Sequence, residues 1–351
     1  METVMTVQES EILEERCKRF VGCKLNRNIY ASEGTLLLKK GVILTESLLK
    51  RLKMDDDRLE EFVRSIPYTS NEYNKLLTGT VEEIREIFSE IKTNPLAISQ
   101  VETLILPKVK LLAKEHRLTI LLNGMQGKDD YTYRHNIGVA IVASLLAKWL
   151  KMTEEEIHLI TLGGLLHDIG KLRIDDHILM KPGALTKEEY EHMQMHAIYG
   201  YEILTNDGRF SEGICLMALE HHEREDGSGY PDGKTAETVH PYSKIIAIAD
   251  VFHAMISDRV YRKGFALYDV LKQIKNDAFR KLEPTHVGLF IKRFMEMAIG
   301  NYAELNNGLH VEIVFVFEDD PINPLVRFHK ELIDLRRSKL YIKKLIDMKN
   351  D

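Results

Sequence analysis

Apolar residues recur at helical spacing from about residue 75 to residue 300, and this pattern leaves few choices of fold class. It is clearest in four segments, VEEIREIFSEI (81–91), NIGVAIVASLLAKWL (136–150), EEEIHLITLGGLL (154–166) and YSKIIAIADVFHAMI (242–256). Apolar side chains three and four residues apart lie on one face of an α-helix, and such faces must pack together. The sequence therefore predicts a mainly α protein built on a helical bundle.

The segment before this stretch reads differently. Residues 20–66 hold short β-compatible pieces around glycines, followed by LTESLLKRL (44–52), a helical segment with Thr45 as a candidate N-cap. Acidic and polar runs then change the composition. We expect a small α+β domain at residues 1–75 with a regulatory or dimerising role.

The segment after the helical stretch also differs. HVEIVFVF (310–317) partly alternates between apolar and polar residues, which predicts a β-hairpin. HKELIDLRRSKLYIKKLIDMKND (329–351) has the spacing of an amphipathic helix with a basic, solvated face. We therefore expect a helical domain with its linker helix at 76–305 and a short hairpin and helix extension at 306–351.

Charge and composition exclude several function classes. The 48 basic and 54 acidic residues give a formal charge of −6, so the surface as a whole offers no attraction to nucleic acid. The three cysteines form no CxxC pair, which argues against a disulfide framework or a thiolate zinc site. The acidic first residues lack the regions of a signal peptide, and no apolar run approaches ~18 residues. We expect a cytoplasmic protein without a membrane partner.

Histidines and aspartates occur in unusual places along the predicted helices. They stand at helix ends or interrupt apolar runs, as in GGLLHDIGK, ALEHHE and IIAIADVF, and the set comprises His135, His167, Asp168, His196, His221, His222 and Asp250. Each histidine alone is more simply a hydrogen-bonded core residue, and Asp250 alone an N-cap or ion-pair partner. A charged aspartate inside an apolar helix costs several kcal/mol unless it is paired or bound to a cation. Together, the five imidazoles and two carboxylates are enough for a dinuclear metal site in a helical bundle.

These residues lie in segments that resemble a known family. HDIGK (167–171), IDDHILMKPGALTKEEYEHMQMH (174–196), HHEREDGSGYPDG (221–233) and IIAIADVFHAMISDRVYR (245–262) closely resemble the HD-GYP subgroup of the HD-domain metal phosphohydrolases, over roughly residues 130–290. The resemblance implies an HD-type helical bundle. It also implies hydrolysis of the bacterial second messenger cyclic di-GMP to linear pGpG, with GMP as a further end product, by a water that bridges two metal ions.

The resemblance also assigns roles to individual residues. It implies one metal held by His135, His167, Asp168 and Asp250, and a second held by Asp168, His196, His221 and His222, with Asp168 bridging. Asp168 and Lys171 are the expected catalytic residues. The expected contacts to substrate are Lys171, Arg259, Arg262 and Tyr230, the last within the Gly229–Pro231 motif that gives the subgroup its name.

Two positions depart from the family pattern. Tyr131 stands where some members place a glutamate for a third metal, so we expect two ions. A ligand set without thiolate favours iron, with manganese, nickel, cobalt or zinc as alternatives. His253 stands where the family usually has aspartate. It lies one helical turn from Asp250, so it either faces the site or is a core histidine.

Two other functions stay open from the sequence alone. One is a catalytically weak sensor of cyclic dinucleotides that signals through a protein partner, with His253 as the deviation that motivates it. The other is an HD phosphohydrolase acting on another nucleotide, against which the GYP loop and the SDRVYR segment argue. Homodimers and signalling proteins are the expected partners besides the nucleotide.

Overall fold

A computed structural model describes residues 20, 25, 27–31, 34–42, 44, 48–49, 52, 59, 70–115, 117–125, 131–257 and 264–346. The chain divides into two compact units, a helical unit of residues 68–294 and a second unit made of residues 1–67 with 295–351. The domain limits expected from the sequence, at residues 75 and 305, stay a prediction, although residue 75 lies within a helix.

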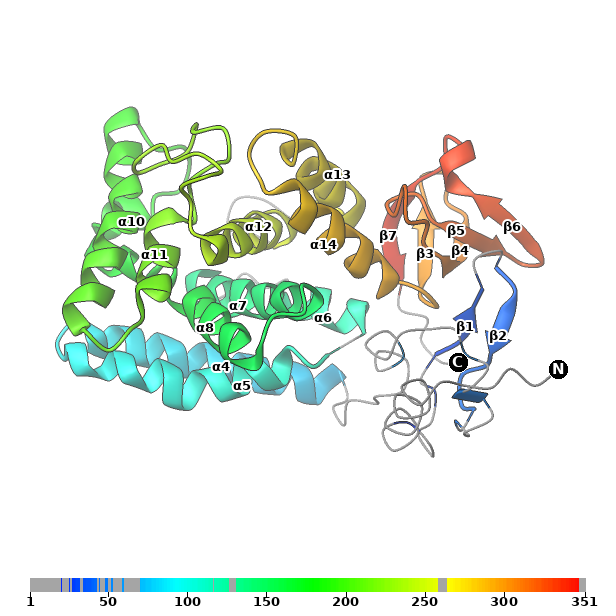
Figure 1. The fold of residues 1–351 in the computed structure, drawn as a ribbon, viewed down its shortest axis with the longest axis horizontal. Helices are drawn as coiled ribbons and strands as arrows, with labels where there is room; N and C mark the ends of the chain where they lie inside the picture. The colour runs from blue at the N-terminus through cyan, green and yellow to red at the C-terminus, as the bar shows by residue number, and fades with distance from the viewer. Residues whose placement is uncertain are drawn as a thin grey trace, which may run out of the picture. The chain divides into compact units, whose positions relative to one another are not determined.

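The helical unit confirms the predicted helical bundle. Within the described part of the chain its helices are α4 (Ser70–Ile91), η1 (Pro95–Ile98), η2 (Val101–Ile105), α5 (Leu106–Leu112), α6 (Leu118–Met125), α7 (Tyr131–Trp149), α8 (Glu154–Leu166), η3 (Ile169–Arg173), α9 (Asp176–Leu179), α10 (Lys187–Asp207), α11 (Glu212–Glu220), α12 (Pro241–Ile256), α13 (Leu267–Asp277) and α14 (Pro284–Glu296) (Figure 1). The four segments with the clearest helical spacing fall in α4, α7, α8 and α12.

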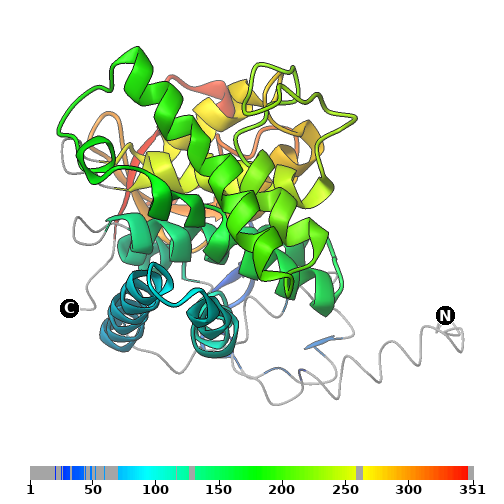
Figure 2. The ribbon, with the colours of Figure 1, turned by 90° about the vertical axis from the view of Figure 1, so that its left-hand side faces the viewer.

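Helix α7 lies at the centre of this bundle. Residues 135–147 are all buried, which is the state expected of a helix that is apolar on every side. Helices α8 and α12 both pack against α7, and α11 packs against α8, α10 and α12. Helices α4 and α5 lie beside one another, and Figure 2 shows them nearly end-on.

Local sequence signals set where the site-bearing helices begin. Thr153 and Glu156 form a capping box at the start of α8, and Thr186 and Glu189 form another at the start of α10. In each, the threonine oxygen accepts from the glutamate N–H while the glutamate carboxylate accepts from the threonine N–H, so two otherwise unsatisfied donors are paired. Helix α12 begins with Pro241, whose fixed φ suits the first helical position.

In the second unit, the described residues form two antiparallel sheets. Strands β1 (Ile29–Tyr30) and β2 (Leu36–Leu38) form a pair, and five strands form a sheet in the order β6-β5-β4-β3-β7, comprising β3 (Tyr302–Leu305), β4 (His310–Phe315), β5 (Leu325–Phe328), β6 (Glu331–Asp334) and β7 (Ile342–Ile346). The β-hairpin predicted from residue 310 is present, because β4 pairs with the next strand, β5, although β4 itself ends at Phe315. Of the predicted helix at 44–52, Leu48 and Leu49 are helical, while Thr45 lies outside the described residues.

The predicted C-terminal amphipathic helix is wrong. Residues 329–346 instead form β6, the short η4 turn (Leu335–Arg337) and β7. Strand β7 pairs with β3, and the two lysines in its middle, Lys343 and Lys344, reach Glu304 at 3.1 and 3.0 Å. The apolar spacing of this segment suits either state, and strand pairing available only in the folded chain decides between them. Among the described residues, the helices are all too short or too polar to cross a membrane.

Candidate metal centre

Residues far apart in the sequence converge where α7, α8, α10, α11 and α12 meet. His135 lies on α7, His167 and Asp168 join α8 to η3, His196 lies on α10, and the last three residues, His221, His222 and Asp250, come from the end of α11 and from α12. Three overlapping groups have ligand atoms within 4.8 Å of one another, namely His135–His167–Asp250, His167–Asp168–His221 and His196–His221–His222. The structure thus brings together all seven side chains that the sequence singles out.

A close backbone approach at Gly170 makes this convergence possible. A Cβ atom at this position would lie 1.9 Å from the carbonyl oxygen of His196, which no real structure tolerates. Glycine therefore lets η3 pack directly on α10. The HDIG segment and His196 meet as a result.

The two carboxylate oxygens of Asp168 face different histidines. Oδ1 lies 3.4 Å from Nε2 of His196 and 3.9 Å from Nε2 of His221. Oδ2 lies 3.4 Å from Nε2 of His167 and 3.8 Å from Nε2 of His135. A carboxylate whose two oxygens point at separate sets of imidazoles is placed to bridge two cations.

The two carboxylate oxygens of Asp250 also face different histidines. Its Oδ1 lies 3.1 Å from Nε2 of His135, and its Oδ2 lies 3.8 Å from Nδ1 of His222. The buried carboxylate on an apolar helix therefore has the partners that its cost of burial demands.

Backbone carbonyls fix the outward ring nitrogens of three histidines. Nδ1 lies 2.7 Å from the Gly164 oxygen in His167, 2.6 Å from the Met193 oxygen in His196 and 3.0 Å from the Ala218 oxygen in His221. A carbonyl can only accept, so each Nδ1 carries a hydrogen, and in the neutral ring Nε2 presents a lone pair to the centre. Within the described part of the chain, Nε2 of His167 and Oδ1 of Asp168 are buried without a hydrogen-bond partner.

The electrostatics keep the carboxylates charged. Burial alone would raise the pKa of Asp168, but the Lys171 ammonium and then His167 hold the pKa of this carboxyl well below its usual range. Burial likewise opposes the charge of Asp250, yet its hydrogen bond with His135 and its electrostatic interaction with His222 lower its pKa well below normal.

The same burial keeps most of the imidazoles neutral. It lowers the pKa of His135, lowers that of His196 to about 4, and, with neighbouring imidazoles, lowers those of His221 and His222 well below normal. His167 differs, because the Asp168 carboxylate outweighs burial and raises its pKa. Ionised carboxylates and neutral imidazoles are the states in which these side chains bind metal.

These observations fit a site for divalent cations. The donor set is imidazole and carboxylate without thiolate, its lone pairs converge, and two of its atoms lack the hydrogen-bond partner that buried polar atoms almost always have. Such a group of side chains suggests metal binding.

The other expected site residues differ in how far the structure describes them. Lys171 donates to Oδ2 of Asp168, so its ammonium stands at the rim of the cluster. The half-buried ring of Tyr230 stacks on His222, with ring centres 4.6 Å apart and planes inclined by 27°. Arg259 and Arg262 lie outside the described residues, so their predicted roles stay predictions.

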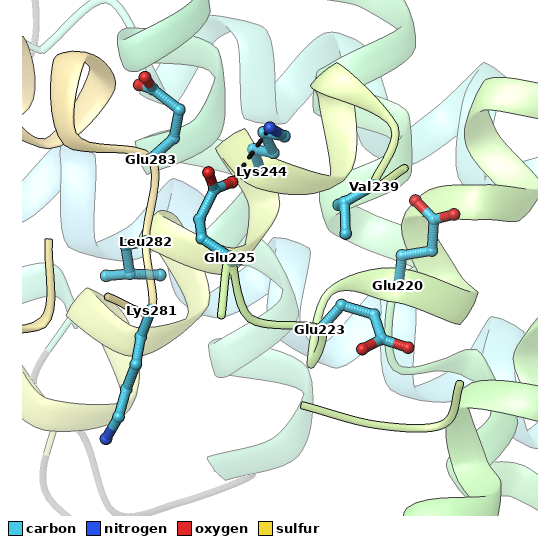
Figure 3. A pocket seen from close by; sticks show the side chains of 9 residues that line it. Glu220, Glu223, Glu225, Val239, Lys244, Lys281, Leu282 and Glu283 are labelled. Carbon is cyan, nitrogen blue, oxygen red and sulfur yellow. Dashed lines mark ion pairs between the residues drawn. The ribbon is translucent and has the colours of Figure 1, made fainter. Parts of the chain in front are cut away.

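Two buried glutamates that the sequence analysis missed anchor the loop that carries Tyr230. Glu223 accepts hydrogen bonds from the N–H groups of Asp232 and Lys234, at 2.8 and 2.9 Å. Glu220 binds the Lys234 ammonium at 2.8 Å and accepts from the His240 N–H at 2.8 Å. Figure 3 shows both carboxylates on the chain around the end of α11, at the edge of a narrow pocket. The only signal in the sequence is that they flank the two adjacent histidines.

A family model described as "HD domain" matches residues 101–285, more than half of the chain. This stretch contains all seven converging side chains. The chain belongs to the HD domain family. Its HD domain thus has the type of fold and motif that the sequence resemblance implies, and the expected family relationship is confirmed.

Several curated proteins are similar to this chain. The cyclic di-GMP phosphodiesterase response regulator RpfG of Xanthomonas campestris is 34% identical over 211 residues, covering 60% of this chain and 56% of the relative. The 3′3′-cGAMP-specific phosphodiesterase 1 of Vibrio cholerae is 36% identical over 165 residues, covering 45% and 36%. This chain spans about half the length of the curated relatives it matches.

A solved structure shares the fold. Bd1817, described as an HDG"Y"P protein from Bdellovibrio bacteriovorus, matches with a TM-score of 0.54 at 18% identity, covering 77% of this chain and 95% of that one. At this identity the similarity concerns the fold alone.

Proposed function

We propose that this HD domain protein hydrolyses cyclic di-GMP to linear pGpG, with GMP as a further end product, using two divalent ions. The observation that carries the proposal is the buried convergence of seven ligands around Asp168. Relatives named as cyclic di-GMP phosphodiesterases support the choice of substrate. We place the protein in the cytoplasm, with homodimerisation and signalling partners as further parts of the proposal.

The proposal divides the seven ligands between two ions that share Asp168. One ion takes His135, His167 and Asp250, and the other takes His196, His221 and His222. Iron is our first choice, with manganese, nickel, cobalt or zinc as alternatives. Bound divalent cations supply a water of lowered pKa and neutralise negative charge on a phosphodiester.

The remaining residues bind and orient the substrate. Lys171, next to Asp168, donates to a phosphoryl oxygen and stabilises the charge that develops there. Arg259 and Arg262 hold the phosphates through paired hydrogen bonds. The exposed part of the Tyr230 ring offers an apolar face to a base. The anchoring of its loop by Glu223 keeps that ring in place.

The test is product analysis with the full chain. Protein loaded with Fe²⁺ or Mn²⁺ is incubated with cyclic di-GMP, and the products are followed by chromatography beside the His167→Ala variant. We expect pGpG from the wild type and none from the variant. Absence of turnover with iron, manganese, nickel and cobalt, combined with tight binding, would instead identify a sensor that signals through a partner.

A related substrate has support from one comparison. The similarity to the Vibrio cholerae enzyme named for 3′3′-cGAMP makes a mixed cyclic dinucleotide the second candidate. A competition panel of cyclic di-GMP, cyclic GMP-AMP and mononucleotides ranks them by kcat/KM. A preference for a mononucleotide would contradict both candidates and favour an HD phosphohydrolase of another type.

A further inference from the structure

His253 lies against a proposed metal ligand. It follows Asp250 by one turn of α12, and its side chain is buried. Its Nδ1 lies 3.1 Å from Nδ1 of His135, and the two rings meet edge to face with centres 5.1 Å apart. Of the two roles that the sequence leaves open, the contact favours one connected with the site.

The position of the ring hydrogen on His135 decides which of the two rings donates the hydrogen bond. Nε2 of His135 faces the Oδ1 atom of Asp250, on the side where the ligands converge. A neutral His135 that binds metal through Nε2 carries its hydrogen on Nδ1 and donates it outward. In His167, His196 and His221 the outward nitrogen meets a backbone carbonyl. In His135 it meets an imidazole nitrogen.

The surroundings hold the His253 ring in this position. A Cβ atom on Gly138 would lie 1.9 Å from Nε2 of His253, so the glycine leaves the space that the ring fills. The Ser257 hydroxyl is placed to donate to the Met125 carbonyl at 3.2 Å. Its oxygen lies 3.1 Å from Nδ1 and 3.4 Å from Nε2 of His253, and it accepts from Nε2–H when Nδ1 carries no hydrogen. The ring is therefore fixed by the backbone of α7 and by its own helix.

We propose that His253 is a positioning residue for the metal centre. Its Nδ1 accepts the hydrogen bond from His135 Nδ1–H, which fixes the His135 ring with Nε2 directed at the ion shared with His167 and Asp250. The proposal rests on the metal site of the proposed function and adds a residue outside the ligand set. Outer partners of metal-bound histidines typically change metal affinity by about 10–100-fold.

Two amide variants separate positioning from packing. In His253→Asn the amide oxygen takes the place of Nδ1 and can accept from His135. In His253→Gln the amide group reaches toward the place of Nε2, away from His135. Both variants are of similar size and polarity, so a difference between them reports on where the acceptor lies. Urea unfolding with a chelator present shows whether each variant folds.

The measurement is Co²⁺ binding to the full chain, followed by titration of the visible absorption bands and by metal analysis after dialysis. We expect His253→Asn to bind within about 3-fold of wild type, and His253→Gln to bind one of two ions at least about 10-fold more weakly with an altered spectrum. Equal affinity and spectra in the two variants, or the reverse order, would overturn the inference alone. Wild-type protein that binds no Co²⁺, Mn²⁺ or Fe²⁺ would overturn the proposed function and the inference together.

Discussion

At the scale of single residues, the proposed metal centre depends on Asp168. Its two oxygens face different histidine pairs, and burial against those imidazoles makes its charge costly without a cation. The Lys171 ammonium compensates part of that charge at Oδ2. We therefore propose separable roles for the two side chains, Asp168 in holding ions and Lys171 in stabilising the substrate.

The bridging role predicts that Asp168→Asn loses metal at both positions. The amide keeps one acceptor oxygen but carries no charge, so neither ion retains a full carboxylate ligand. We expect fewer than one metal equivalent per chain after dialysis, measured by elemental analysis. Glu202→Gln, an exposed change on α10, is the matched control and keeps the wild-type content. Two equivalents retained in the Asp168 variant would exclude a bridging role.

The proposed role of Lys171 predicts that its loss lowers kcat while metal binding is kept. Lys171→Met keeps the length of the side chain and removes its charge. We expect unchanged or higher metal affinity, because a competing cation beside Asp168 is lost, and a kcat lower by about 10²–10³-fold, as for removal of other charge-stabilising donors. Steady-state kinetics and metal analysis of one preparation check both parts. A wild-type kcat would show that Lys171 does not contact the reacting phosphate.

At the scale of elements, the site requires close packing of η3 on α10 and an anchored loop after α11. Gly170 permits the first, and the buried carboxylate of Glu223 provides the second. Neither contact involves the side chain of a proposed metal ligand. Both can therefore be changed while every proposed ligand is kept.

Gly170→Ala should separate η3 from α10. Its Cβ would overlap the His196 carbonyl, so we expect a loss of unfolding free energy of about 1–3 kcal/mol or more, together with weaker metal binding. Gly79→Ala is the matched control, because no atom lies within 4 Å of its Cβ and alanine favours the α4 helix. Urea denaturation with and without Mn²⁺ compares them. An equally stable, metal-replete Gly170 variant would contradict the packing argument.

Glu223→Gln should loosen the Tyr230 loop without changing the metal content. The amide NH₂ would face one of the two backbone N–H groups that the carboxylate now accepts from, and an unsatisfied buried donor costs about 1–3 kcal/mol. We expect a higher KM for the cyclic dinucleotide with kcat less affected. Glu237→Gln, on an exposed side chain of the same loop, serves as the control. A KM equal to wild type would show that the anchor does not act on the substrate site.

The sequence predicts part of this organisation and misses the rest. Helices α7, α8 and α12 follow from local apolar spacing, and the seven ligands from their unusual positions and motif resemblance. The role of Glu223 depends on how the loop that follows it folds back onto its carboxylate, and that of His253 on a contact with His135 from another helix. No local pattern encodes either contact. The apolar spacing of the segment that forms β7 predicts a helix, because the pairing of β7 with β3 exists only in the folded chain.

At the scale of the whole molecule, bound metal should stabilise the folded state of the helical unit. Its ligands come from helices spread along residues 135–250, and they converge only in the folded state. A cation that binds the native state tighter than the unfolded chain stabilises it by RT ln(1 + [L]/Kd), about 2.7 kcal/mol at a concentration of 100 Kd.

Chelation therefore lowers the stability of the helical unit selectively. We expect a calorimetric transition that moves to lower temperature with EDTA and returns with Mn²⁺. A second transition, from the unit containing β3–β7, stays in place, because its described residues contribute no ligand to the cluster. A calorimetric scan of metal-replete protein that EDTA leaves unchanged would contradict the stabilisation by metal.

The most direct test of the proposed dinuclear metal centre is anomalous diffraction from crystals of the Mn²⁺- or Fe²⁺-loaded full chain, collected at the metal absorption edge. We expect two anomalous-difference peaks about 3.5–4 Å apart, with Asp168 between them and the six other ligands around them. No peak within this cluster, or peaks only elsewhere on the molecule, would contradict it.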